Sequence, residues 1–242
     1  MKILVPVKRV VDYNVKVRVK AAVDKKKFDA IYKDHDVVVI AVGAQEGRVI
    51  PFPGHEDVIK GIDYLKEINF GKPRNMRGKK VVVIGAGNVG MDIACQAYDH
   101  GAATVVAVDV QKPAAFGKEM ELATAQGTQI LFPKMTERFD AKAGKIFFKD
   151  GTSLDADAVI ISIGDKPVLD FLPPSINTER GYITVNELGQ TSDVKVFAIG
   201  DATKPGLVTH AIGQGKVTAD KVHALLMNTD YVPEERVLIP YA

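Results

Sequence analysis

The sequence has a single cysteine, no tryptophan and no long hydrophobic run in its 242 residues. One cysteine excludes internal disulfides, CxxC redox pairs and cysteine-ligated iron–sulfur or zinc sites, because each of these needs at least two thiolates. Any redox chemistry therefore requires a bound organic cofactor. The longest apolar stretches, at 37–42 and 81–84, are far shorter than the roughly 20 residues that cross a membrane.

A strong excess of either charge is also missing, since the sequence contains 32 Lys and Arg residues and 30 Asp and Glu residues. No basic run is interleaved with aromatic residues, so we expect no nucleic-acid partner. Lys8 and Arg9 interrupt the apolar N-terminus, which excludes a signal-peptide pattern and predicts a cytoplasmic protein without membrane association. The five histidines lack metal-ligand spacing and no nucleophile–base motif is present, so we predict neither a metal site nor a catalytic side chain.

Short β-branched runs alternate with longer amphipathic segments, which is typical of an α/β fold with a parallel sheet and crossover helices. The predicted strands cover residues 3–7, 15–19, 37–42, 81–84, 105–109, 129–132, 145–148, 158–162 and 196–199. The predicted helices cover residues 25–33, 57–68, 89–100, 117–126 and 208–228. Polar segments at 71–80 and 165–167 separate a central block, 79–165, from its flanks.

The central block opens on a glycine motif, Gly85-Ala-Gly-Asn-Val-Gly90, that follows an apolar strand and begins a helix. In this pattern Gly85 permits a tight turn, Gly87 lets a pyrophosphate approach the backbone, and Gly90 lets the helix pack on the strand. The helix start, with Asn88 and Val89, then turns free amides toward the phosphates. The pattern predicts a Rossmann-like dinucleotide site; the alternative is a glycine turn without a ligand.

The next predicted strand ends at Asp109, 24 residues after Gly85. An acid at this spacing accepts hydrogen bonds from the adenosine ribose, and its charge would repel a 2′-phosphate, so we predict NAD rather than NADP. NADP stays open as an alternative, because the charge of Lys112 would reach a 2′-phosphate if Asp109 turned away. Asp109 as an exposed acid at a strand end is the other alternative.

Three further segments carry patterns of their own. Residues 37–44 form an apolar strand ending at Gly43, residues 161–167 contain Gly164 in a Gly-x-x-Pro turn, and residues 191–201 end at Gly200-Asp201. Together with the glycine motif, they resemble the two-dinucleotide-binding flavoproteins, a pyridine nucleotide-disulfide oxidoreductase-like family, in the branch similar to the glutamate synthase small subunit. The resemblance covers residues 21–230.

The resemblance implies a Rossmann-like NAD(P) domain at 79–165, inserted in an FAD-domain-like α/β unit formed by 21–78 and 166–242. It implies that Asp201 accepts a hydrogen bond from the flavin ribityl chain. The helix that follows, with His210 and Ala211 in its first turn, would stabilise negative charge on a reduced flavin. For His210, a packing or surface role is the alternative.

The family's FAD domain begins with a second GxGxxG loop, which this sequence does not contain. Residues 1–20 instead resemble the start of the electron transfer flavoprotein β subunit. The sequence thus predicts an NAD(P)H-dependent oxidoreductase component with an incomplete FAD site. One alternative is a shortened nucleotide-binding module or subunit, which needs a partner subunit or a second copy; another is a flavin-free dehydrogenase.

Overall fold

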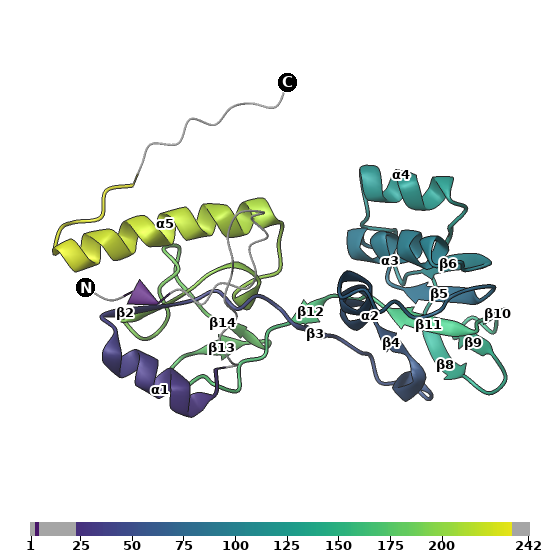
Figure 1. Ribbon diagram of the computed structural model, residues 1–242, viewed down its shortest axis with the longest axis horizontal. Coiled ribbons are helices and arrows are strands. Elements are labelled where there is room, and N and C mark those ends of the chain that lie inside the picture. Colours follow the sequence, from purple (N-terminus) through teal and green to yellow (C-terminus); the bar gives the residue numbers. More distant parts are fainter. Residues whose placement is uncertain (1–2, 5–22, 234–242) are drawn as a thin grey trace, which may run out of the picture. The chain divides into compact units, whose positions relative to one another are not determined.

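The structure is a computed structural model, which describes residues 3–4 and 23–233 (Figure 1). The chain folds into two compact units. One is Gln45–Asp165, and the other combines the residues up to Ala44 with those from Lys166 onward. Both units contain parallel sheets with helices, which confirms the predicted α/β class. The strand predicted at 15–19 and most of that at 3–7 lie outside the described residues.

The unit Gln45–Asp165 is built on a five-stranded parallel sheet in the order β4-β11-β5-β6-β7. Its strands are β4 (Ile59–Lys60), β5 (Lys80–Ile84), β6 (Thr104–Val108), β7 (Gln129–Leu131) and β11 (Ala158–Ile161). From β5 the chain proceeds to β6 on one side, and it returns as β11 on the other. The carboxyl end of β5 is therefore a topological switch point, where open α/β sheets bind ligands.

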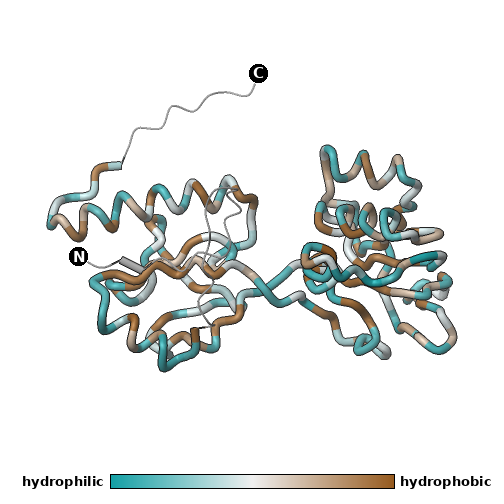
Figure 2. Tube along the Cα trace, viewed as in Figure 1, coloured by the Kyte–Doolittle hydropathy of each residue, from teal (hydrophilic) through white to brown (hydrophobic). Residues whose placement is uncertain are grey.

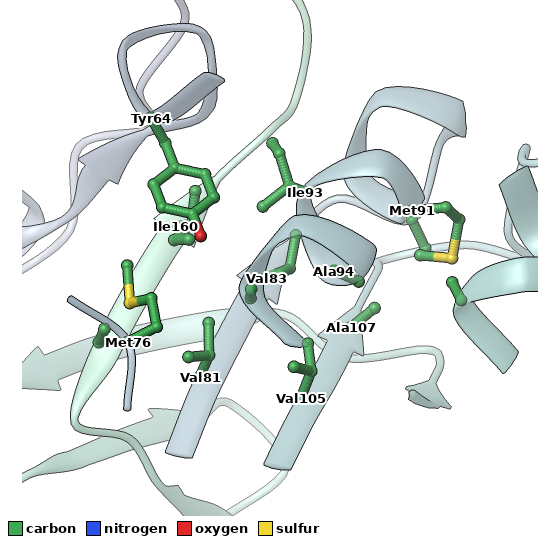
Figure 3. Packing of buried hydrophobic residues seen from close by; sticks show 14 residues of the cluster. Tyr64, Met76, Val81, Val83, Met91, Ile93, Ala94, Val105, Ala107 and Ile160 are labelled. Carbon is green, nitrogen blue, oxygen red and sulfur yellow. The ribbon is translucent and has the colours of Figure 1, made fainter. Parts of the chain in front are cut away.

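Each face of this sheet has its own cover (Figure 1). One face packs against α2 (Gly61–Asn69), α3 (Asn88–Asp99) and α4 (Lys118–Ala125). The other packs against an antiparallel sheet of β8 (Thr136–Asp140), β9 (Lys145–Phe148) and β10 (Ser153–Asp155). Because side chains alternate along a strand, Val83 of β5 lies in the cluster under the helices (Figure 3), whereas Ile84 lies in the opposite one.

Two predicted elements differ from the structure. The strand at 145–148 is present as β9, but its placement in a parallel sheet was wrong: β9 pairs antiparallel with β8 and β10, since the connections at 141–144 and 149–152 are too short for a crossover. The helix predicted at 57–68 starts later, because Ile59–Lys60 pairs with β11 as β4 and α2 begins at Gly61. The polar segment at 71–80 joins α2 to β5 within this unit.

The other unit has a three-stranded parallel sheet in the order β1-β2-β15. Its main elements are β1 (Ile3–Leu4), α1 (Lys25–Asp34), β2 (Val37–Ile40), β15 (Val196–Ala198) and α5 (Val208–Met227). Strand β2 is buried on both faces: Val38 and Ile40 pack with Phe28 of α1, whereas Val37 and Val39 pack with Val222 of α5. In Figure 2 the sheet strands of each unit are among the most apolar parts of the tube.

The remaining elements are short. Strands β3 (Glu46–Gly47) and β12 (Asp165–Lys166) form one two-stranded sheet, and β13 (Thr178–Glu179) and β14 (Tyr182–Ile183) form another. Two 3-10 turns, η1 (His55–Asp57) and η2 (Gly200–Ala202), complete the described chain. No helix in this part of the chain has both the length and the apolar character needed to cross a membrane.

Candidate functional site

The glycine motif lies at the switch point, between β5 and α3, and two of its glycines are required by close packing. Gly85 has a φ of +107°, and a Cβ built on it would lie 2.2 Å from the carbonyl oxygen of Ser162, just after β11. A Cβ on Gly90 would lie 2.1 Å from the carbonyl oxygen of Gly85. Neither position has room for a side chain: Gly90 lets α3 pack against the turn that ends β5, and Gly85 lets this turn pack against the residue that follows β11.

Gly87 is different, because its backbone does not need glycine and its surroundings are open. Its φ is −83°, and apart from its chain neighbours no described atom lies within 4 Å of a Cβ built on it. It is the N-cap of α3, with no side chain capping the helix and no acidic residue in the first turn. The exposed Val89 follows in the same turn. The space beside Gly87, facing the positive end of a 12-residue helix, suits an anionic group such as a pyrophosphate.

Asp109 follows β6 and lies beside this turn, as its spacing predicted. Its Oδ2 accepts a hydrogen bond from the Ala86 N–H at 2.8 Å, and its Oδ1 accepts one from the Gln111 N–H at 3.1 Å. A carboxylate oxygen accepts two hydrogen bonds, so each oxygen retains capacity for a ribose hydroxyl. The carboxylate thus organises the glycine turn and remains able to bind a ligand.

The side chain of Asn88 forms hydrogen bonds with the loop before α4 and with α4 itself. Its Oδ1 accepts from the Phe116 N–H at 3.0 Å, and its Nδ2 lies 3.5 Å from the Phe116 carbonyl oxygen and 3.4 Å from Glu119 Oε2. Sequence reasoning placed Asn88 among the cofactor-binding residues. In the structure its backbone faces the site, whereas its side chain joins α3 to the loop before α4.

A cavity of about 320 Å³ extends from Gly85 and Asp109 along the carboxyl ends of the strands. Its lining includes Phe52, Lys134 and Ile163, which sequence reasoning did not assign to the site. Phe52 lies in the segment Pro51-Phe-Pro-Gly54, which connects β3 to η1. Nothing in the sequence marks Lys134, because its place depends on β8 and β9 folding over the sheet.

Lys134 is held by a polar cluster at the edge of the cavity. Its Nζ lies 2.6 Å from Asp150 Oδ2 and 2.7 Å from Thr152 Oγ1. The hydrogen bond from Lys134 to Asp150, together with the side-chain and backbone hydrogen bonds from Thr152, holds the pKa of Asp150 well below its ordinary value. Lys134 is therefore held at the edge of the cavity by its ion pair with Asp150.

Gly164 lies beyond β11, and its carbonyl oxygen accepts a hydrogen bond from the Arg48 N–H at 3.0 Å. Gly43, the other glycine that was predicted to follow an apolar strand, comes after β2 in the other unit and has a positive φ. Each of the two glycines lies in the turn that follows its apolar strand, with a positive φ.

The predicted flavin contacts in this part of the chain lie in η2 and in the first turn of α5, and their polar groups bind other groups of the same segment. The Gly200 N–H donates to Gln214 Oε1 at 2.7 Å, and Asp201 Oδ1 accepts from the Gly206 N–H at 3.1 Å. His210 Nδ1 accepts from the Leu207 N–H at 3.1 Å, so His210 caps α5. The Ala211 methyl group is 3.5 Å from a Cβ built on Gly200.

The lone cysteine lies within α3, in a half-buried position. Burial, followed by the negative charges of Asp92 and Asp99, raises the pKa of the Cys95 thiol. A raised pKa opposes thiolate formation, so this residue is unsuited to thiol redox chemistry. Within residues 3–4 and 23–233, no three His, Cys, Asp or Glu side chains are placed to hold a metal ion.

Comparisons with known proteins agree with this architecture. The assimilatory nitrate reductase electron transfer subunit of Bacillus subtilis is 28% identical over 205 residues, covering 78% of this chain and 26% of that protein. The putative oxidoreductase YgfK of Escherichia coli O157:H7 is 27% identical over 217 residues, covering 78% and 21%. This chain thus spans about a quarter of the length of these relatives.

Among solved structures, thioredoxin reductase of Lactococcus lactis has a similar fold, with a TM-score of 0.65 at 20% identity, covering 79% of this chain and 66% of that one. The model of the pyridine nucleotide-disulphide oxidoreductase family, whose members bind FAD and NAD(P), matches residues 3–215. Because this match covers most of the sequence, the chain belongs to the pyridine nucleotide-disulphide oxidoreductase family.

Proposed function

We propose that residues 79–165 bind NAD(P)H and that the chain is an oxidoreductase component, which passes a hydride from this coenzyme to a flavin and on to a further acceptor. One observation carries the proposal. Gly85 and Gly90 have no room for a Cβ, whereas the position of Gly87, between them in the motif, opens onto free space at the start of α3. Fold stability does not require glycine there, but the approach of a pyrophosphate does.

We propose NADH as the preferred coenzyme. The Asp109 carboxylate lies at the glycine turn, 2.8 Å from the Ala86 nitrogen, where its charge would repel a 2′-phosphate. NADPH remains the alternative, with Lys112 as the group that would meet the phosphate. In either case the residues of this chain bind and orient the coenzyme, which itself supplies the hydride.

The flavin part of the proposal assigns 21–78 and 166–242 to a partial FAD-binding-like domain, in the branch similar to the glutamate synthase small subunit. Gly43, Gly200, Asp201 and the start of α5 are the residues that this domain would offer. They do not make a pyrophosphate site by themselves, because the sequence has no second GxGxxG loop. This chain alone therefore offers only part of a flavin site.

The second candidate is a nucleotide-binding module that works only with a partner, either another subunit or a second copy of this chain. The missing glycine loop favours it. The relative from Bacillus subtilis is named as a subunit, which is consistent with such an arrangement.

Calorimetric titration of the purified protein with NADH tests the first part of the proposal. Gly87→Ala should abolish binding and leave the unfolding curve unchanged. Gly213→Ala is a matched control: it lies in α5, has open space around its Cβ, and should bind NADH as the wild type does. Undiminished NADH binding by Gly87→Ala would exclude this site.

Colour distinguishes the two candidates. A yellow preparation with stoichiometric flavin supports the oxidoreductase component, and a colourless protein that still binds NADH supports the partner-dependent module. Light scattering then shows whether the protein is a monomer, which counts against the second-copy arrangement. Failure to bind either NADH or flavin would overturn both candidates.

A further inference from the structure

The loop between β6 and α4, residues 110–117, has little apolar burial. None of its residues is fully buried, although the small side chain of Ala115 packs against the cluster under the helices. Its two large apolar side chains, Val110 and Phe116, are 54% and 64% exposed. The position of the loop therefore depends largely on its hydrogen bonds.

Asn88 provides two of these bonds from the first position of α3. Its Oδ1 accepts from the Phe116 N–H, and its Nδ2 donates to the Phe116 carbonyl oxygen. The side-chain amide thus pairs with both backbone groups of one residue, as a neighbouring strand would. A third bond runs beside them, from the Ala115 N–H to the Ala86 carbonyl oxygen at 3.2 Å.

The opposite end of the loop is fixed at Asp109, whose carboxylate binds the amides of Ala86 and Gln111. The loop is thus tied to Ala86 and Asn88, the neighbours of Gly87 on either side. The space at Gly87 itself stays open. A dinucleotide with its pyrophosphate at Gly87 and its ribose at Asp109 would have this loop along its adenosine end.

We infer that Asn88 is a positioning residue, which holds the 110–117 loop beside the adenosine half of the dinucleotide without contacting the dinucleotide through its side chain. The inference rests on the proposed function, because it assumes that a dinucleotide binds at the glycine motif. A positioning role can be distinguished from a direct ligand contact. If Asn88 only positions the loop, removing the Phe116 N–H should weaken dinucleotide binding as much as removing the Asn88 side chain does.

Two variants cut the link from opposite ends. Asn88→Ala removes the side-chain amide. Phe116→Pro leaves Asn88 intact and removes the backbone N–H that donates to Asn88 Oδ1. Phe116→Ala is the matched control, since it removes the ring and keeps the N–H. We expect each of the first two variants to weaken NADH and ADP-ribose binding about tenfold, as the loss of one or two hydrogen bonds predicts. The double variant should be no weaker than either single one.

Hydrogen exchange of the ligand-free protein gives the readout that does not depend on binding. In Asn88→Ala, the amides of Ala115 and Phe116 should exchange faster than in the wild type, and those of β5 should not. Phe116→Ala should match the wild type in affinity and in exchange. ADP-ribose and NADH should lose affinity by the same factor, because the loop borders the half that they share.

Three results would overturn the inference while leaving the proposed function intact. The first is unchanged hydrogen exchange of the loop amides in Asn88→Ala. The second is wild-type affinity for NADH in Phe116→Pro, and the third is additive losses of affinity in the double variant. Either of the last two results would indicate that the Asn88 side chain contacts the ligand directly. If the wild-type protein binds neither NADH nor ADP-ribose, the proposed function fails and the adenosine role of the loop fails with it. Exchange then reports only whether Asn88 holds the loop.

Discussion

The Ala86 N–H donates to Asp109 Oδ2 at 2.8 Å, which joins the glycine turn after β5 to the acid that ends β6. The two residues are 23 positions apart in sequence. They meet because β5 and β6 are adjacent parallel strands, paired from Lys80–Thr104 to Ile84–Val108. The bond means that Asp109 affects both the shape of the turn and the charge of the site.

Replacing Asp109 separates these two roles. Asp109→Asn removes the charge and replaces one of the two accepting oxygens with an NH2 group, so one of the bonds from Ala86 and Gln111 is lost. We expect a smaller loss of stability than in Asp109→Ala and a rise of about tenfold in affinity for NADPH relative to NADH. Asp109→Ala also removes the acceptor and should lower the free energy of unfolding by about 1–3 kcal/mol. Fluorescence titrations with both coenzymes and urea unfolding measure the effects. A wild-type protein that prefers NADPH tenfold would refute the role of Asp109 in selectivity.

Gly90→Ala should damage the fold, because its Cβ would meet the Gly85 carbonyl oxygen at 2.1 Å. Relief of this overlap requires α3 to move from the turn, at a cost of about 1–3 kcal/mol. Urea unfolding, compared with Gly87→Ala, measures the difference. Equal stability of the two variants would mean that the close approach at Gly90 is easily relaxed.

Tyr64→Phe should stabilise the protein. The Tyr64 side chain is fully buried in the cluster under the helices, beside Ile160 (Figure 3), and its hydroxyl has no hydrogen-bond partner among the described atoms. Removal of an unpaired buried hydroxyl should raise the free energy of unfolding by about 1 kcal/mol. Tyr98→Phe is the control with the opposite sign, because the Tyr98 hydroxyl accepts from the Val105 N–H at 3.2 Å.

The same residue makes stability sensitive to alkaline pH. Burial, followed by the charges of Asp99 and Glu67, raises the pKa of Tyr64 from 10.0 to about 12. Above pH 10 the unfolded chain loses this proton and the folded chain keeps it, so the free energy of unfolding falls as the pH rises toward 12. Unfolding curves between these pH values should show a steeper loss for the wild type than for Tyr64→Phe. Parallel losses would contradict a buried neutral Tyr64.

Cys95 should react slowly with thiol reagents at neutral pH, because its raised pKa keeps the thiol protonated. Asp92→Asn removes one of the charges that raise this pKa and should speed the reaction. Cys95→Ala should bind NADH as the wild type does. A rapid reaction of the folded wild-type protein would contradict the inert role assigned to this cysteine.

Local patterns predicted most of the regular structure, since all five helices of the structure and the core strands lie close to the expected residues. The β8–β10 sheet was mostly missed, because Thr136–Asp140 is largely polar and only its pairing with β9 makes it a strand. Strand β4 was missed for a similar reason. Ile59–Lys60 is too short to give a periodic pattern, and it becomes a strand by adding to β11.

The candidate site likewise has features that the sequence predicted and features that it did not. The glycine spacing and the acid at the end of the second strand predicted the backbone of a dinucleotide site, because turn geometry and ribose recognition need those residue types at those distances along the chain. The position of Lys134 at the cavity and the bond of Asn88 to Phe116 had no signal in the sequence. Both depend on segments that meet only after the sheet has formed.

Local periodicity, motif spacing and the single cysteine were enough to predict the α/β class and the nucleotide motif and to exclude internal disulfides. Tertiary structure alone decided which glycines serve the fold and which leaves room for a ligand. Gly85, Gly87 and Gly90 are identical as letters. They differ because the carbonyl oxygens of Ser162 and Gly85 lie against two of them and nothing lies against the third.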